Sequence, residues 1–215
     1  MKILITSIVA LFGFLPAIFA QGSTQVNYSA PLGHRTVYLN GTTAVPNGNS
    51  VWLGGFNSGF NVSASANNPQ SLLSNWHEYD RTTINSLPPF NQAGSFSDSG
   101  TSTLPVFDNL RMYLWIFATD DGQAPAPGFA NVTAYGLFTS STDPDWVFPA
   151  VTTPFPGNTK DIYTGDAIQA TRGNIDAAHL YLLSFNPVPE PSTLALLGIG
   201  VPTVVLLLRK RHQNR

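Results

Sequence analysis

Met112-Tyr113-Leu114-Trp115-Ile116-Phe117 is an unbroken apolar and aromatic run near the middle of the chain. Successive side chains of a β-strand point to opposite faces of a sheet, so a strand that is apolar at every position is buried on both faces. The run is followed by Asp120-Asp121-Gly122, a typical turn sequence. We therefore predict a central strand over residues 111–118 that is covered on both sides.

Shorter apolar runs on either side of this strand are also separated by turn-forming residues. Thr36–Leu39 precedes Asn40-Gly41, and residues 51–53 precede Gly54-Gly55. Further candidate strands are residues 132–138, 145–148 and 179–185. Short strands with frequent turn signals are typical of all-β proteins. The sequence predicts a mainly β chain folded as a single β-sandwich-like domain with one short helix.

The predicted helix begins at Asn68 and Pro69, because asparagine caps helix N-termini and proline fits the first turn. Leu87-Pro88-Pro89 bars a long continuation, so we expect a helix of about three turns. Apolar residues at helical spacing then predict one face that packs against a sheet. These residues are Leu72, Leu73, Trp76 and Tyr79.

Two other segments lack a clear strand pattern. Residues 90–105 are polar and rich in glycine and serine, which predicts a loop or a hairpin. Residues 144–156 contain four prolines, which predicts a long ordered excursion around Trp146 and Phe148.

The composition excludes several classes of function. Charged residues make up 10% of the chain and the formal net charge is -2. Electrostatic binding of nucleic acid requires clustered Lys and Arg, so nucleic acid is not an expected partner. The chain contains no cysteine, which excludes disulfides, thiolate metal sites and cysteine catalysis. Hydrophobic burial and sheet hydrogen bonds must hold the fold together.

Residues 1–20 have the layout of a secretory signal peptide. Met1-Lys2 supplies a positive charge, residues 3–15 form an apolar segment, and Ala20 is the expected cleavage site for signal peptidase. An uncleaved membrane anchor is the alternative, and both readings predict an exported chain. The exported passenger spans residues 21–187, a length that fits one domain.

The last residues predict where the exported chain goes. An apolar run over residues 194–208 would cross the inner membrane as a transmembrane helix of marginal length. Arg209, Lys210 and Arg211, in the basic end over residues 209–215, hold that end on the cytoplasmic side, so the main domain lies outside the cytoplasm. The apolar run is preceded by the proline-rich segment Val188, Pro189, Glu190, Pro191, Ser192 and Thr193.

These three elements, in this order, resemble the PEP-CTERM sorting tail of Gram-negative bacteria that produce exopolysaccharide. The resemblance covers only residues 188–215, with Pro189-Glu190-Pro191 as the recognised motif and Val188, Ser192 and Thr193 as its flanks. It implies that exosortase, an integral-membrane cysteine protease, recognises the motif and releases or transfers the passenger to the cell surface or the extracellular matrix. A plain C-terminal anchor behind a proline-rich linker is the alternative.

The search for catalytic chemistry finds no recognisable motif. His77-Glu78-Tyr79-Asp80-Arg81 lacks the second histidine that would place two zinc ligands one helical turn apart. No serine lies in a Gly-x-Ser-x-Gly turn, and His34, His77 and His179 lie far apart in the sequence. Loop carboxylates could bind Ca²⁺, although turn formation explains them better; they belong to Asp120, Asp121, Asp143, Asp145, Asp161 and Asp166. We predict no catalytic residue, no metal site and no cofactor.

The aromatic residues leave two function classes open. Trp52, Trp146 and Tyr135 could stack on sugar rings if exposed, whereas most rings in so aromatic a chain belong to the core. The passenger also resembles an uncharacterised group of exported bacterial proteins, on cues such as residues 51–56 and 113–117, and this implies no chemistry. The prediction is a non-enzymatic surface or matrix protein, with exopolysaccharide as a candidate partner. The alternative is an exported polysaccharide hydrolase, or a carbohydrate-binding module, with acids drawn from Asp143, Asp145, Asp120 or Asp121.

Overall fold

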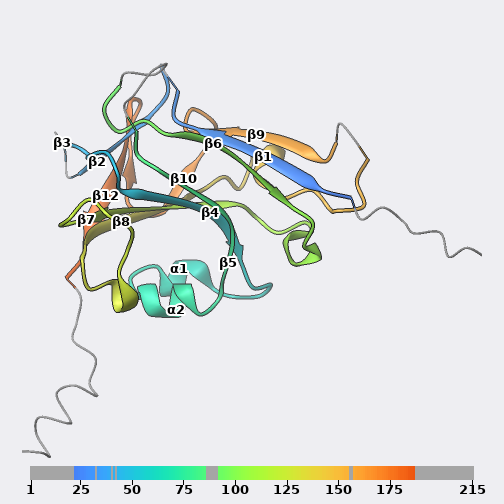
Figure 1. The fold of residues 1–215 in the computed structure, drawn as a ribbon, viewed down its shortest axis with the longest axis horizontal. Coiled ribbons are helices and arrows are strands. Elements are labelled where there is room, and N and C mark those ends of the chain that lie inside the picture. The colour runs from blue at the N-terminus through green and yellow to red at the C-terminus, as the bar shows by residue number, and fades with distance from the viewer. Residues whose placement is uncertain are drawn as a thin grey trace, which may run out of the picture.

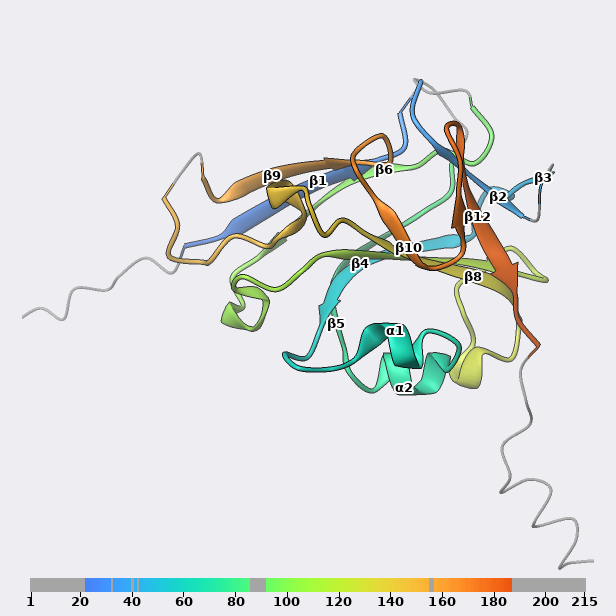
Figure 2. The same ribbon diagram turned by 180° about the vertical axis from the view of Figure 1, so that it is seen from behind.

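The computed structural model describes residues 22–31, 33–39, 41, 43–85, 92–154 and 157–186. This part of the chain is mainly β and forms two sheets with a few short helices (Figure 1). The prediction of a mainly β protein is confirmed. Figure 2 shows three layers, with the smaller sheet on one side of the larger sheet and the helices α1 and α2 on the other.

The larger sheet has the strand order β3-β2-β12-β8-β7-β4-β5, and β10 and β11 pair with β8 and β12. Its strands are β2 (Thr36–Leu39), β3 (Thr43–Ala44), β4 (Ser50–Phe56), β5 (Trp76–Thr83), β7 (Tyr113–Thr119), β8 (Val132–Thr139), β10 (Gln169–Arg172), β11 (Asn174–Ile175) and β12 (His179–Ser184). The predicted strands around residues 36–39, 51–53, 111–118, 132–138 and 179–185 are therefore confirmed. Strand β12, the last of the described strands, lies between β2, to which it is parallel, and β8, to which it is antiparallel.

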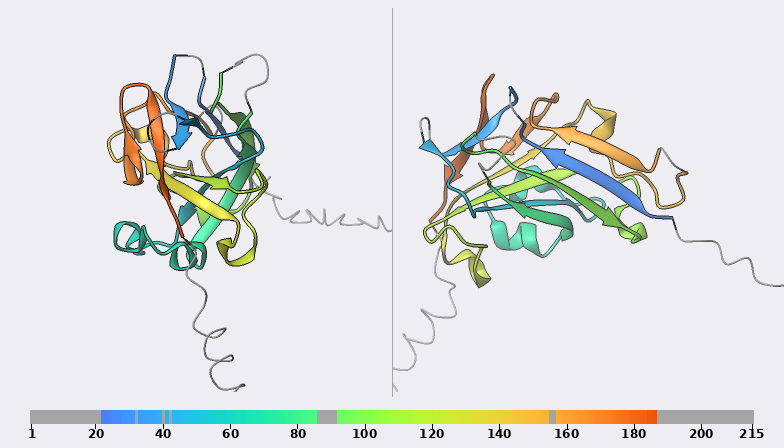
Figure 3. Two further views of the ribbon diagram at one scale, coloured as in Figure 1. Left: turned by 90° about the vertical axis from the view of Figure 1, so that its left-hand side faces the viewer. Right: turned by 45° about the horizontal axis from the view of Figure 1, so that its top comes forward.

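The smaller sheet has the order β6-β1-β9. Strand β1 (Thr24–Ser29) is antiparallel to β6 (Ser97–Ser102) and parallel to β9 (Thr159–Tyr163). Figure 3, in its right-hand view, shows these three strands side by side above the larger sheet. Both sheets contribute to one buried cluster, with Val26 and Ile162 from the smaller sheet and Leu53 and Leu180 from the larger.

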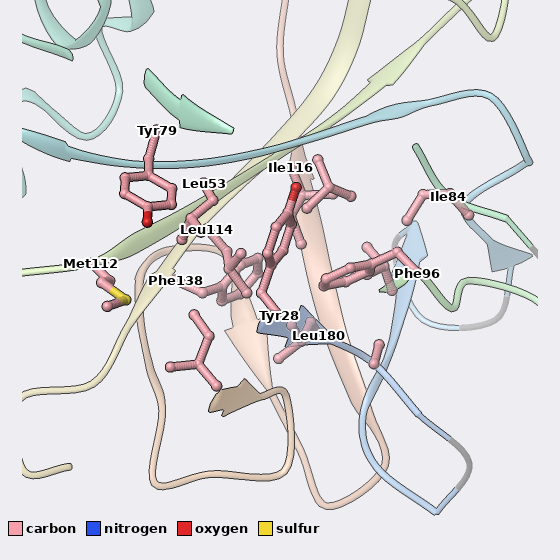
Figure 4. Close-up of a cluster of buried hydrophobic side chains, with 14 of the residues drawn as sticks. Tyr28, Leu53, Tyr79, Ile84, Phe96, Met112, Leu114, Ile116, Phe138 and Leu180 are labelled. Carbon is pink, nitrogen blue, oxygen red and sulfur yellow. The ribbon is translucent and has the colours of Figure 1, made fainter. Parts of the chain in front are cut away.

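Strand β7 separates two buried layers. Its Leu114 and Ile116 lie in the layer between the sheets, whereas Trp115 and Phe117 lie in the layer on the helix side, and all four are at most 1% exposed. The prediction of a central strand covered on both faces is confirmed. Figure 4 shows the layer between the sheets, hereafter the inner core, with Tyr28, Leu53, Tyr79, Ile84, Phe96, Met112, Leu114, Ile116, Phe138 and Leu180.

The layer on the helix side, hereafter the outer core, is mostly aromatic. It is covered by the one-turn helices α1 (Val62–Ser65) and α2 (Pro69–Leu73) and by the 3-10 turn η2 (Pro127–Phe129). The Asn68 side chain accepts a hydrogen bond from the Ser71 N–H at 3.0 Å, so the predicted cap is confirmed. The outer core consists of Trp52, Phe56, Val62, Leu72, Trp115, Phe117, Phe129, Val132, Tyr135 and Leu137.

The predicted length of the helix is wrong. Helix α2 ends at Leu73, and Trp76 and Tyr79 belong to strand β5, which pairs antiparallel with β4. Because these residues are three apart, a strand places them on opposite faces. Trp76 packs against the outer core and Tyr79 lies in the inner core. The same spacing that fits one face of a helix therefore also fits two faces of a strand.

The predicted turn at Gly54-Gly55 is also wrong, because β4 continues through both glycines to Phe56 with a register shift between Leu53 and Gly54. A Cβ atom at Gly54 would lie 2.6 Å from Cζ2 of Trp76. Glycine is required here because the Trp76 ring lies directly against the backbone of β4.

Two further segments differ from expectation. Residues 145–148 do not form a strand: the 3-10 turn η3 (Pro144–Trp146) is followed by a single bridge between Val147 and Arg111. The polar segment 90–105, predicted as a loop or hairpin, contains strand β6 and the start of the 3-10 turn η1 (Pro105–Phe107). The backbone of β1 holds β6 in place, so β6 needs no apolar pattern of its own. The ordered excursion around Trp146 and Phe148 is confirmed, since both side chains are 0% exposed.

Candidate functional site

The predicted sorting and processing residues lie outside the described part of the chain. They are the cleavage site Ala20, the motif Val188, Pro189, Glu190, Pro191, Ser192 and Thr193, the apolar run 194–208, and the basic residues Arg209, Lys210 and Arg211. Within the described ranges, no helix combines the length and apolar character needed to span a bilayer. The described residues nevertheless show how the fold ends immediately before the motif.

Five of the six loop carboxylates named above hold local structure rather than meeting at one site, and the sixth, Asp120, is placed by a hydrogen bond from its backbone N–H to the Asn131 carbonyl. The Asp143 side chain accepts from the Asp145 N–H at 2.9 Å, and Asp145 in turn accepts from Nζ of Lys160 at 2.8 Å. Oδ2 of Asp166 accepts from Nε1 of Trp146 at 3.0 Å and from the Tyr163 N–H at 2.7 Å.

Asp121 and Asp161 have similar local roles. The Asp121 side chain accepts from the Gln123 N–H, and this hydrogen bond is the main reason that the pKa of Asp121 is lowered. The Asp161 side chain accepts from Nδ2 of Asn27 at 2.6 Å. Among the described residues, no group of three or more His, Asp or Glu side chains is arranged to hold a metal ion.

The three histidines remain apart in the fold. Nε2 of His77 lies 2.6 Å from Oδ1 of Asn57, and the His34 ring packs near Tyr163. His179 lies beside Asp176 and Tyr181 at the turn between β11 and β12. Oδ1 of Asp176 accepts from two backbone N–H groups of this turn, and Oδ2 accepts from the Tyr181 hydroxyl. These hydrogen bonds hold the pKa of Asp176 well below its usual range, and the bond from Tyr181 has the largest effect. Asp176 is therefore occupied in fixing the turn.

The aromatic residues considered for sugar stacking are buried. Trp52 is 7% exposed, and Trp146 and Tyr135 are 0% exposed. The core interpretation is confirmed for all three, and none of them forms an exposed platform.

The end of β12 forms the most specific arrangement near the sorting segment. Nη2 of Arg172 donates to the Ser184 carbonyl at 2.9 Å, and the Phe185 N–H donates to the Thr133 carbonyl at 2.7 Å. The Phe185 ring packs against Tyr135 with 5.4 Å between ring centroids. We call Arg172, Ser184, Phe185, Thr133 and Tyr135 the exit clasp, because they fix the end of β12 and the residue after it, close to the end of the described residues.

Burial gives the exit clasp its unusual electrostatics. Arg172 is only 7% exposed, its guanidinium carbon lies 3.9 Å from the Tyr135 ring centre, and burial lowers its pKa. Burial also raises the pKa of Tyr135 to about 12, so its hydroxyl stays protonated and donates to the Ala66 carbonyl beside α1 at 2.9 Å. The clasp therefore ties the chain exit to the outer core and to α1. Sequence reasoning missed this cluster, because an isolated Arg172 beside Gly173 carries no local signal.

The comparisons with known proteins concern the segment directly beyond the clasp. Residues 187–211 match the family model described as the PEP-CTERM protein-sorting motif. No curated protein and no solved structure matches the chain. The matched residues begin two positions after Phe185, so a single residue, Asn186, lies between Phe185 and the matched segment in the sequence. The chain thus carries a PEP-CTERM sorting motif, the mark of an exported protein that is sorted through its C-terminus and processed by exosortase, a membrane protease.

Proposed function

We propose that this protein is a non-catalytic passenger of the cell surface or extracellular matrix, delivered by its sorting motif. Signal peptidase removes residues 1–20, the apolar run 194–208 holds the chain in the inner membrane, and exosortase acts at Pro189-Glu190-Pro191. The observation that carries this proposal is the family match over residues 187–211, directly after the clasped end of β12.

The position of the clasp supports release of an intact domain. Phe185 makes the last described backbone hydrogen bond, to Thr133, and the motif begins beyond it. Cleavage at or after Pro189 would remove no strand of either sheet. The passenger would therefore keep its fold after the tail is removed.

The outward face of the smaller sheet supports a non-catalytic role in a hydrated matrix. Nε2 of Gln25 donates to Oδ1 of Asn27 and to Oγ of Ser99, at 3.0 Å in each case. Amides and hydroxyls, with the carboxylate of Asp161 beside Asn27, solvate this face, which suits contact with hydrated polysaccharide. The described loop aspartates are held in turns and pairs, so we favour a binding or structural role over hydrolysis.

The motif is tested by Glu190→Ala in a host that contains exosortase. The apolar run and the basic end are unchanged, so we expect the variant to insert into the membrane but to keep its tail and accumulate there. Mass spectrometry of the wild-type C-terminus checks processing directly. Asn186→Ala is the matched control, since it changes a neighbouring residue outside the motif and should be processed like the wild type. A wild-type terminus intact to Arg215 would refute sorting by cleavage.

A further inference from the structure

The exit clasp restricts how far the domain can lie from the sorting motif. Pro189 lies four positions after Phe185 in the chain, and four extended residues span at most about 14 Å. Whatever binds the motif must therefore come within about 14 Å of the clasp, close enough to touch the surface around it.

The surface beside the exit is formed by α1, α2 and the η2 turn. Tyr135 links Phe185 to α1 through its hydrogen bond to Ala66, and Nε2 of Gln70 on α2 lies 3.7 Å from the position of a Cβ on Gly128 in η2. Figures 1 and 2 show both helices and η2 on the side of the molecule from which the described chain ends. We call the exposed side of these three elements the exit face.

The exit face carries no charge. No Asp, Glu, Lys, Arg or His occurs from Asn57 to Trp76 or from Gly122 to Thr142, the two stretches that contain α1, α2 and η2. Leu73 of α2 is nonetheless 41% exposed, and it lies three residues from Gln70, on the same side of the helix. Depletion of charged residues is characteristic of the core of protein–protein interfaces, and Leu73 adds apolar area to this uncharged surface.

The chemistry of this face distinguishes a protein from a lipid surface. Attraction to anionic lipid requires Lys or Arg, and the exit face has neither. Insertion into a bilayer requires a broad apolar face, whereas here one leucine stands among Ser, Asn, Gln, Ala and Pro. We propose that the exit face docks on the extracytoplasmic surface of the membrane protease that recognises the sorting motif. This inference rests on the proposed function above, and it adds a second contact besides the motif itself.

Leu73→Asp and Leu73→Lys test the docking surface in the full-length chain, in a host that contains exosortase. Either charge would be buried without a partner, so we expect both variants to lose their tails about tenfold more slowly than the wild type, and Leu73→Met to behave like the wild type. Leu104→Asp is the matched control. Leu104 is 56% exposed and directly precedes η1, which is not part of the exit face.

Thermal unfolding of each variant separates docking from folding, because Leu73 is exposed and its variants should unfold at the wild-type temperature. Normal processing of both charged Leu73 variants, or equal slowing by Leu104→Asp, would overturn the docking surface while leaving sorting intact. A wild-type chain that keeps its tail would instead overturn the proposed function. A photo-reactive residue at position 73, in a host whose protease is catalytically inactive, should cross-link to the protease. Adducts with lipid alone, or equal protease adducts from position 104, would overturn the proposal.

Discussion

The inner and outer cores lie on opposite faces of the same sheet, and they differ in the residues that form them and in the elements that cover them. The inner core is closed by a second sheet, and tyrosine hydroxyls at its margin are satisfied: Tyr28 donates to Asp80 at 3.1 Å and Tyr79 donates to the Thr24 carbonyl at 2.8 Å. The outer core is closed by one-turn helices and is mostly rings. Among the described residues, the buried indole N–H groups of Trp52 and Trp115 have no hydrogen-bond partner.

The difference shows what short covering elements require. A one-turn helix has little stability of its own, so the layer beneath it must supply the energy that holds it in place. Trp52 and Trp76 meet Trp115 at 77° and 75°, with ring centroids 5.7 and 5.5 Å apart. These edge-to-face contacts are favourable for aromatic quadrupoles. Packing of large aromatic rings therefore stabilises the layer on the helix side, whereas the second sheet stabilises the layer on the other face.

The largest effect should come from a charge in the outer core. Trp115→Asp places an unpaired carboxylate at a side chain that is 0% exposed, which should cost several kcal/mol, on the order of the whole stability of a domain. Solubility and near-ultraviolet circular dichroism check this. Tyr113→Asp, in the same strand on the same face but only partly buried, should be tolerated far better. A soluble and normally folded Trp115→Asp protein would show that the outer core is dispensable.

An intermediate loss of stability is expected from a substitution that compares the two cores directly. Phe117→Leu removes ring contacts with Trp52, Trp115, Phe129 and Tyr135, and it should lower the free energy of unfolding by at least about 2 kcal/mol. Ile116→Leu, at the neighbouring inner-core position, keeps the volume and should cost under about 1.5 kcal/mol. Urea unfolding of both proteins measures the difference. Equal losses in the free energy of unfolding would mean that ring contacts do not make the outer core more sensitive to substitution than the inner core.

The smallest effect should come from the helices themselves. Asn68→Ala removes the cap of α2 and should cost about 1 kcal/mol, because the rings beneath still hold the helix. Asn61→Ala, which removes the matching cap of α1, should cost a similar amount. Thermal unfolding reports both values. A loss of stability as large as that of Trp115→Asp would mean that the helices, and not the aromatic rings, stabilise this layer.

The strands of the larger sheet were predictable where burial on one or both faces leaves an apolar pattern. Residues 112–117, 132–138 and 179–185 carry that pattern in their own sequence. The smaller sheet was not predictable in this way, because β6 reads Ser-Asp-Ser-Gly-Thr-Ser and is defined by its pairing with β1, a strand far away in the chain. Trp76 and Tyr79 were placed on a helix because their spacing fits a helical face as well as the two faces of β5.

The same contrast applies to the candidate site. The sorting motif was predictable because its proline spacing, apolar run and basic end are contiguous in the sequence, and the family match covers them. The exit clasp was not, because Arg172, Tyr135 and Phe185 come from three different strands or strand ends and meet only in the folded sheet. A motif made of consecutive residues can be recognised in the sequence, whereas contacts between strands are visible only in the folded structure.

The central position of β12 determines when the fold can close. A protein chain is made from its N-terminus, so Thr36–Leu39 is made early and remains without its partner His179–Leu182 until late. Until those last residues arrive, β2 and β8 present open edges, and such edges readily pair with other chains. The sheet is therefore completed only when the segment directly before the sorting motif becomes available. Strand β12 thus closes the aggregation-prone edges of β2 and β8 as the last of the described strands to be made.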